Sequence, residues 1–293
     1  MQPTQAGILA EGPKLARYLT FSIDSSDDIL DALNALKDIC NPDETIIGFG
    51  KSLADKLGKK IPGLQTFPAM SSCGIDVPST PSALWCWLRS DDGGELFHRS
   101  RLIENILAPA FTLTDVTDSF KYAENRDLSG YVDGTENPDG EDAIEAAIAS
   151  NLGSGLDGSS FVAVQQWLHD FDMFDAMSTK EQDDTIGRHI ADNEEFDEAP
   201  ASAHVKRTAQ ESFTPEAFML RRSMPWSDGM NAGLMFVAFG KSFDAFDVML
   251  KRMIGEEDGI VDGLFEFTHP VTGAYYWCPP TTNGKLDLSA LGL

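Results

Sequence analysis

The sequence lacks any long apolar run. No stretch approaches the roughly 20 consecutive apolar residues that a membrane-spanning helix requires. The N-terminal segment, residues 1–24, has no basic region followed by a long apolar core, so it does not have the pattern of a signal peptide. We therefore expect a cytoplasmic protein with no membrane partner.

Cysteine and basic residues are scarce as well. The four cysteines form no Cys-x-x-Cys or Cys-x-x-Cys-His motif, which excludes zinc-ribbon, thioredoxin-like and c-type haem sites. Unpaired cysteines are typical of a reducing compartment. Only 22 lysines and arginines oppose 47 aspartates and glutamates, and the net charge of −25 makes nucleic acid a poor partner.

The chain does contain alternating strand and helix patterns in 293 residues, enough for two domains. Two segments, "IIGFGKSLADKL" (46–57) and "FVAFGKSFDAFD" (236–247), share FGKS after a strand pattern. Neither has the GxxxxGK[ST] spacing of a phosphate loop. The echo favours an internal duplication into two α+β units, each a sheet covered by helices on one face, with a border near 125–155.

The loop "GYVDGTENP" (130–138) is a candidate functional segment. Its Asp-Gly pair is common in surface turns, and in isolation a plain turn is the simpler interpretation. A calcium loop starting at Asp133 is excluded, because Pro138 and Ile144 stand where the sixth-position Gly and the twelfth-position acid are needed. The third interpretation is a rigid cradle, in which glycines let the backbone approach a flat ligand that Asp133 faces.

A basic island follows around His204. Lys206, Arg207, Arg221 and Arg222 lie within a short stretch of this acidic chain, and Arg188 lies just upstream. Cations in such a protein indicate an anionic ligand, and a neutral imidazole beside them suits a metal. Together with bulky apolar strands, this set fits haem, with iron on the histidine and carboxylates on the cations. A solvated basic turn is the alternative.

Taken together, four motifs resemble one family. "GYVDGTENP", "AHVKRT", "LRRSMPW" and "VTGAYYWCPP" occur in the order found in dye-decolouring haem peroxidases, most closely the cytosolic bacterial branch. The resemblance covers nearly the whole chain. It implies an α+β fold of two ferredoxin-like domains, residues 1–130 and 131–293, with one haem b per chain in the second.

The resemblance also implies roles for individual residues. His204 matches the protein ligand to iron, Asp133 the acid/base on the opposite side of haem, and Arg221 the arginine beside it. The remaining cofactor-binding candidates are Ser223, Asp262 as the partner of the histidine (with Asp258 as the alternative), and Arg188 and Arg207 as propionate partners. Leu234 and Phe236 are expected on an apolar wall, because they share one strand face.

The implied reaction is the oxidation of dyes and small aromatic donors by hydrogen peroxide. The alternative is a porphyrin-handling protein that binds haem or releases its iron with little peroxidase turnover. The family likeness further implies a homo-oligomer. Some relatives dock into an encapsulating shell protein through a C-terminal extension; for the short tail here, residues 285–293, we expect packing against the domain instead.

Overall fold

The computed structural model describes residues 3–25 and 27–293. The N-terminal half contains η1 (Ala6–Ile8), β1 (Leu15–Ile23), α1 (Ile29–Ile39), β2 (Thr45–Phe49), α2 (Lys51–Lys56), β3 (Met70–Ser72), β4 (Ile75–Val77), β5 (Leu84–Ser90), α3 (Gly93–Leu107) and β6 (Phe111–Phe120). The C-terminal half contains α4 (Gly140–Ala147), β7 (Ser160–His169), α5 (Phe171–Ala176), α6 (Thr179–Ile186), α7 (His204–Arg207), η2 (Gln210–Ser212), β8 (Leu220–Arg221), β9 (Met224–Asp228), β10 (Asn231–Gly240), α8 (Asp244–Met253), η3 (Gly263–Glu266), β11 (Thr268–Pro270), β12 (Ala274–Cys278), β13 (Thr281–Thr282), β14 (Lys285–Leu286) and η4 (Ser289–Leu291).

The main sheet is continuous through both halves. In the described residues it has ten strands in the order β11-β7-β12-β2-β5-β1-β6-β9-β10-β8. An additional antiparallel pairing of β7 with β10 closes it into a barrel-like ring. Single residue pairs join the halves, Ser119 with Trp226 and Trp277 with Phe49. The expected α+β class with antiparallel strands is confirmed, but the strands of the two units share one sheet.

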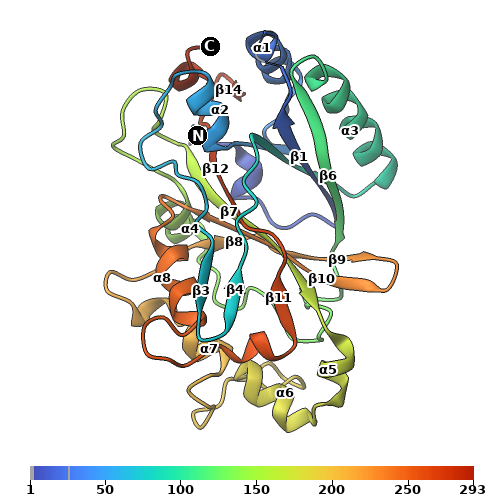
Figure 1. Cartoon of the computed structure of the whole chain (residues 1–293), viewed down its shortest axis with the longest axis vertical. Coiled ribbons are helices and arrows are strands. Elements are labelled where there is room, and N and C mark those ends of the chain that lie inside the picture. The colour runs from blue at the N-terminus through green and yellow to red at the C-terminus, as the bar shows by residue number, and fades with distance from the viewer. Residues whose placement is uncertain (1–2, 26) are drawn as a thin grey trace.

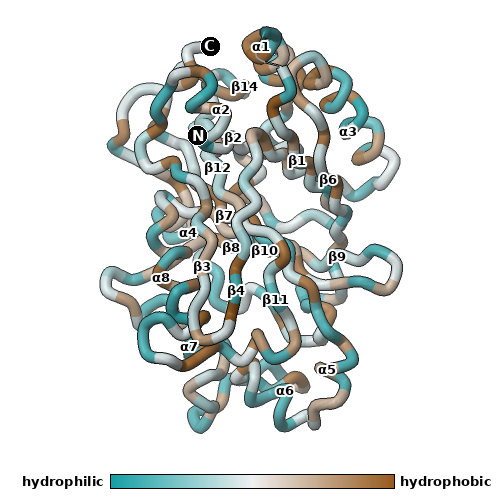
Figure 2. The backbone as a smooth tube through the Cα atoms, viewed as in Figure 1, coloured by the Kyte–Doolittle hydropathy of each residue, from teal (hydrophilic) through white to brown (hydrophobic). Residues whose placement is uncertain are grey.

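The two faces of this sheet are buried in different ways. On β5, Trp85 and Trp87 point to one face, while Leu84, Cys86 and Leu88 belong to the opposite face. The tryptophan face packs with side chains of β1, β7, β10 and β12 inside the ring, and the other face packs with helices such as α1, α3 and α8. The helices α1 and α3 lie beside β1 and β6 (Figure 1). This alternation follows from the period of two along a strand. Hydrophilic residues gather on outer helices such as α6 (Figure 2).

Four strands of the main sheet in each half can be compared by their order in space. The N-terminal strands lie as β2-β5-β1-β6, and the C-terminal ones as β12-β7-β10-β9. Counted along the chain, both halves therefore have the spatial order of second, third, first and fourth strand, in one direction or the other. The FGKS echo does not mark equivalent places, because it follows the second strand in one half and the third in the other. The echo is therefore not a trace of duplication.

Two segments cross between the halves. The hairpin β3–β4 extends beside α8 (Figure 1), and Cys73 Sγ at its tip contacts the carbonyl oxygen of Gly255 at 3.6 Å. The C-terminal tail packs against the core through Leu286, Leu288 and Leu291, all of which are buried. No helix among the described residues is long and apolar enough to cross a bilayer.

Candidate functional site

A cavity lies between the outer face of strands β7 and β10 and the helices α7 and α8. It brings together His204, Asp133 and Arg221, which the sequence separates widely. Most of the other lining side chains are apolar: Val132, Trp167, Ile186, Leu234, Phe236, Phe246, Met249, Leu250, Met253, Leu264 and Phe267. Leu234 and Phe236 thus line the wall on which the strand pattern predicted them.

His204 begins the short helix α7 and reaches the cavity from the helical side. Its Nδ1 lies 2.8 Å from Oδ2 of Asp262, which is 1% exposed. The other carboxylate oxygen of Asp262 accepts the backbone N–H of Leu264 at 2.9 Å. Because a carboxylate only accepts, Nδ1 carries a proton, and in the neutral imidazole Nε2 then keeps its lone pair. Nε2 has no hydrogen-bond partner in the described part of the chain, and is therefore the ring atom available to a metal.

Asp133 sits in a loop held by its own backbone. Its N–H donates to the carbonyl of Asn125 at 2.8 Å, and Gly130 and Gly134 on either side have φ of +92° and +77°. Those left-handed conformations favour glycine. Burial raises the pKa of Asp133, and the charge of Asp127 raises it further, whereas Arg221 lowers it. The net effect is a raised pKa for Asp133, a direction that the sequence alone does not settle.

The same loop fixes Arg221. The side-chain amide of Asn137 accepts the backbone N–H of Arg221 at 2.8 Å and donates to its carbonyl at 2.9 Å. The guanidinium Nε is buried and has no hydrogen-bond partner among the described residues. An unsatisfied buried donor in a cavity wall indicates a missing acceptor. Asn137 was not predicted as a site residue, although it stands in the motif "GYVDGTENP".

A second histidine–aspartate pair lies in the cavity wall. His169 Nε2 is 3.0 Å from Oδ1 of Asp127, and Nδ1 is 2.6 Å from Oγ1 of Thr268. The same hydroxyl lies 3.0 Å from the carbonyl oxygen of Leu168, so Thr268 holds the ring in place from its Nδ1 side. Burial would raise the pKa of Asp127, but hydrogen bonds from His169 and Ser129 bring it below its usual range. The signal that could have found His169 is its place in a strand, where it shares a face with Gln165 and Trp167.

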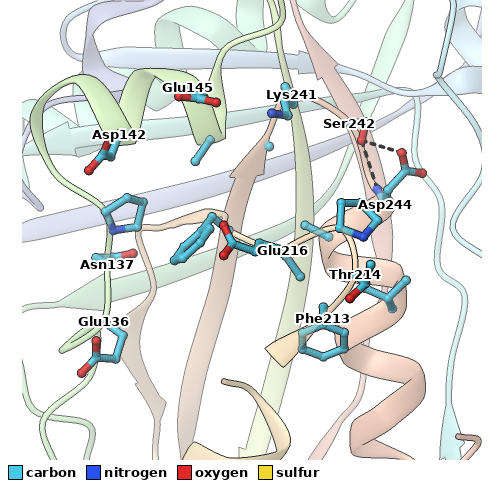
Figure 3. Close-up of a pocket in the computed structure, with 18 of the residues that line it drawn as sticks. Glu136, Asn137, Asp142, Glu145, Phe213, Thr214, Glu216, Lys241, Ser242 and Asp244 are labelled. Carbon is cyan, nitrogen blue, oxygen red and sulfur yellow. Dashed lines mark hydrogen bonds between the residues drawn. The ribbon is translucent and has the colours of Figure 1, made fainter. Parts of the chain in front are cut away.

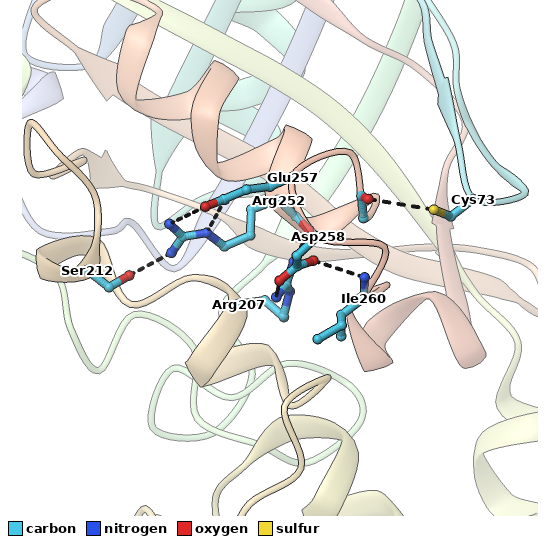
Figure 4. A network of polar contacts seen from close by, with 8 residues as sticks. Cys73, Arg207, Ser212, Arg252, Glu257, Asp258 and Ile260 are labelled. Carbon is cyan, nitrogen blue, oxygen red and sulfur yellow. Dashed lines mark hydrogen bonds and ion pairs between the residues drawn. The ribbon is translucent and has the colours of Figure 1, made fainter.

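Three expected cofactor contacts do not line this cavity. Arg207 is paired through both terminal nitrogens with Asp258, at 2.7 and 2.8 Å (Figure 4). Arg188 donates to two carboxylates, those of Glu136 and Glu195. Ser223 lies in a neighbouring hollow that also touches Asp133 and Arg221. In each arginine the carboxylate partner satisfies the charge, which is why the density of cations in the sequence overstated the number in the cavity.

A larger hollow lies on the opposite face of α8 (Figure 3). Its rim is acidic, with Glu136, Asp142, Glu145, Glu216 and Asp244 around one lysine. No group of three or more His, Cys, Asp or Glu side chains suited to a metal ion occurs in the described residues. The lining of this hollow includes no histidine among the described residues, whereas the His204 cavity combines an imidazole with apolar walls and is the better candidate for a cofactor.

Comparisons with known proteins agree on one family. A family model described as "Dyp-type peroxidase, C-terminal" matches residues 124–283. A "Dye-decolorizing peroxidase" of Rhodococcus erythropolis is 32% identical, over 80% of this chain and 71% of the relative. One of Mycolicibacterium paratuberculosis is 31% identical, over 84% and 77%.

Solved structures give the same result. A putative dyp-type peroxidase from Shewanella oneidensis superposes with a TM-score of 0.88 at 28% identity, covering 99% of this chain and 98% of that one. A DypB variant from Rhodococcus jostii RHA1, solved in complex with heme, superposes with a TM-score of 0.85 at 27% identity, covering 96% and 97%.

Proposed function

The chain belongs to the Dyp-type peroxidase family, and from that premise we propose that it is a haem b peroxidase that uses hydrogen peroxide to oxidise dyes and small aromatic donors. The observation that carries the proposal is the cavity shared by His204, Asp133 and Arg221. It has apolar walls on its sheet and helix sides, and it holds two nitrogens that have no hydrogen-bond partner in the described part of the chain: Nε2 of His204 and the buried Nε of Arg221.

These residues fit a haem. His204 would hold the iron through Nε2, and Asp262 would keep the ring in the required tautomer and increase its basicity. The apolar side chains of β10 and α8 that line the cavity would pack against the porphyrin. When bound, haem supplies an iron that binds peroxide and exchanges electrons with it.

The residues opposite His204 would handle protons and charge. Ionised Asp133 would take a proton from peroxide and return it to the departing oxygen, as a positioned general acid/base. Its raised pKa brings proton affinity closer to that task, because a catalytic pKa works best near the operating pH. Arg221 would stabilise the negative charge that develops as the O–O bond breaks, and Asn137 would hold it in place.

Finer features belong to the same proposal. Each half is a ferredoxin-like unit, residues 1–130 and 131–293, since both share one strand order. There is one haem per chain, and the protein is a cytoplasmic homo-oligomer. Arg188 and Arg207 would contact the cofactor only by exchanging their carboxylate partners for it. Ser223 would contact it from the neighbouring hollow. The buried leucines of the tail favour packing over docking into a shell protein.

The test compares absorption spectra and turnover. Haem-supplemented wild type should show a Soret band, His204→Ala should lose it, and His269→Ala, an exposed histidine, should keep it. Peroxide-dependent dye oxidation should fall in Asp133→Ala and Arg221→Ala while their Soret bands remain. A wild type that binds haem but turns over no faster than these variants would favour the porphyrin-handling alternative. A wild type without bound haem would refute the proposal.

A further inference from the structure

One buried side-chain amide in the cavity wall has N–H groups without a hydrogen-bond acceptor among the described residues. Gln165 lies in the middle of β7, is 1% exposed and lines the cavity. Its Nε2 is buried and has no hydrogen-bond partner in residues 3–25 and 27–293. Buried polar groups in proteins are almost always paired, so an unpaired one calls for a ligand.

The orientation of this amide is fixed by its neighbour. The indole N–H of Trp167 donates to Oε1 of Gln165 at 3.3 Å. Indole is a donor only, so the reversed amide would set N–H against N–H. Oε1 is therefore held against the indole, and both N–H groups of Nε2 are left for another acceptor.

Gln165 shares a sheet face with Arg221. The register pairs Gln165 with Phe236 and Arg221 with Ala238, both across β10. Directly paired residues lie on the same face, and so do residues two apart along a strand. Two buried donors without partners, Arg221 Nε and Gln165 Nε2, thus belong to the sheet wall. His204 comes from the helical side of the same cavity.

We propose that Gln165 is a further substrate-positioning residue, whose amide donates a hydrogen bond to the oxygen of peroxide, or to a small anion, bound opposite His204. The inference rests on the proposed function. Gln165 transfers no proton, because an amide does not titrate near neutral pH; it holds a lone pair of the ligand. Asp133 remains the proton acceptor, and Arg221 supplies the charge.

Fluoride is the probe, since it binds ferric haem and accepts hydrogen bonds without undergoing reaction. The haem-loaded protein is titrated with fluoride, and the absorption change gives Kd. Gln165→Leu should raise Kd about 10- to 100-fold, the worth of a hydrogen bond to a charged acceptor. The rate of reaction with peroxide, followed by stopped-flow absorption, should fall in parallel.

The matched control is Gln166→Leu. Gln166 is the same residue type one position along, on the opposite face of β7, and it does not line the cavity. Its fluoride Kd should equal that of wild type. Gln165→Asn, which withdraws the amide by one methylene, serves if the leucine variant does not retain haem, and its Kd should also rise.

The outcomes separate the two proposals. If wild type binds haem and fluoride but the Gln165 variants bind fluoride with unchanged Kd, the role of Gln165 is wrong and the peroxidase proposal stands. If these variants weaken haem binding and leave fluoride affinity unchanged, the amide bonds the cofactor, which also overturns this inference. If wild type binds no haem, both fail.

Discussion

Replacing Asp262 with asparagine should lower haem affinity, which depends on the orientation of His204, much more than it lowers the stability of the fold. The carboxylate accepts Nδ1–H of His204 through one oxygen and the N–H of Leu264 through the other. In Asp262→Asn the amide oxygen can keep the contact with Leu264, and the amide nitrogen then faces Nδ1. Because that nitrogen only donates, His204 must move its proton to Nε2, the atom proposed to bind iron.

The expected magnitudes differ for the two properties. Loss of a residue that orients a metal-binding histidine typically lowers metal affinity by about 10- to 100-fold. The cost to the apoprotein is smaller, because a charge-assisted hydrogen bond is exchanged for a neutral one, a difference of about 1 kcal/mol. Asp262→Ala, which also loses the contact to Leu264 at the start of η3, should cost about 1 kcal/mol more.

Haem titration monitored at the Soret band measures the affinity, and urea unfolding of the apoprotein measures the stability. Asp258→Asn is the control, since it makes the same substitution nearby but breaks the pair with Arg207 instead. It should lower the stability only slightly, because the Asp258 side chain is 39% exposed and its ion pair is screened by solvent, and it should change haem affinity less than tenfold. Equal haem affinity in Asp262→Asn and wild type would refute the reasoning, as would equal losses in both variants.

Two further predictions concern the cavity and its wall. Because burial raises the pKa of Asp133, wild-type activity should begin to fall, as the pH is lowered, at a pH above about 4, the usual pKa of an aspartate. Asp133→Asn should abolish this acidic limb of the pH–rate profile and lower kcat/KM by about 10²- to 10⁴-fold. Gly233→Ala should lower the free energy of unfolding in urea by about 1–3 kcal/mol, because the new Cβ would lie 1.9 Å from the carbonyl oxygen of Trp167. An unfolding midpoint equal to that of wild type would contradict the tight approach of β10 to β7.

Local patterns predicted much of the fold. The sequence shows a strand pattern over 161–170, which is β7, and a helical pattern over 241–255, which is α8. The helical period is visible because α8 buries one face, whereas β7 is buried on both faces. The closure of the ring depends on the β7–β10 pairing and on single contacts between the halves. Such contacts join distant segments and leave no local period, so the sequence did not predict one continuous sheet.

Some cavity residues could likewise be predicted from the sequence, and others depend on contacts that only the fold creates. His204, Asp133 and Arg221 were found because each stands in a motif whose order is informative. Gln165 and Asn137 were missed, because their importance depends on which neighbours meet them in space. A buried glutamine within a strand is the signal that could have singled out Gln165, since a polar side chain in that position needs a partner.

The arginines show how composition misleads and structure corrects. A cation is unusual in a chain with 47 acidic residues, so clustered cations indicated an anionic ligand. In the folded chain, half of the ten arginines meet carboxylates among the described residues, as Arg188, Arg207 and Arg252 do. Arg221 forms no ion pair among the described residues, and its Nε has no partner at all. Arg222 also lacks a carboxylate partner, but it donates to the backbone carbonyls of Ile8 and Leu9. In so acidic a protein, the arginine that marks a ligand site is one that lines a cavity and whose guanidinium neither carboxylates nor backbone carbonyls of the described residues satisfy.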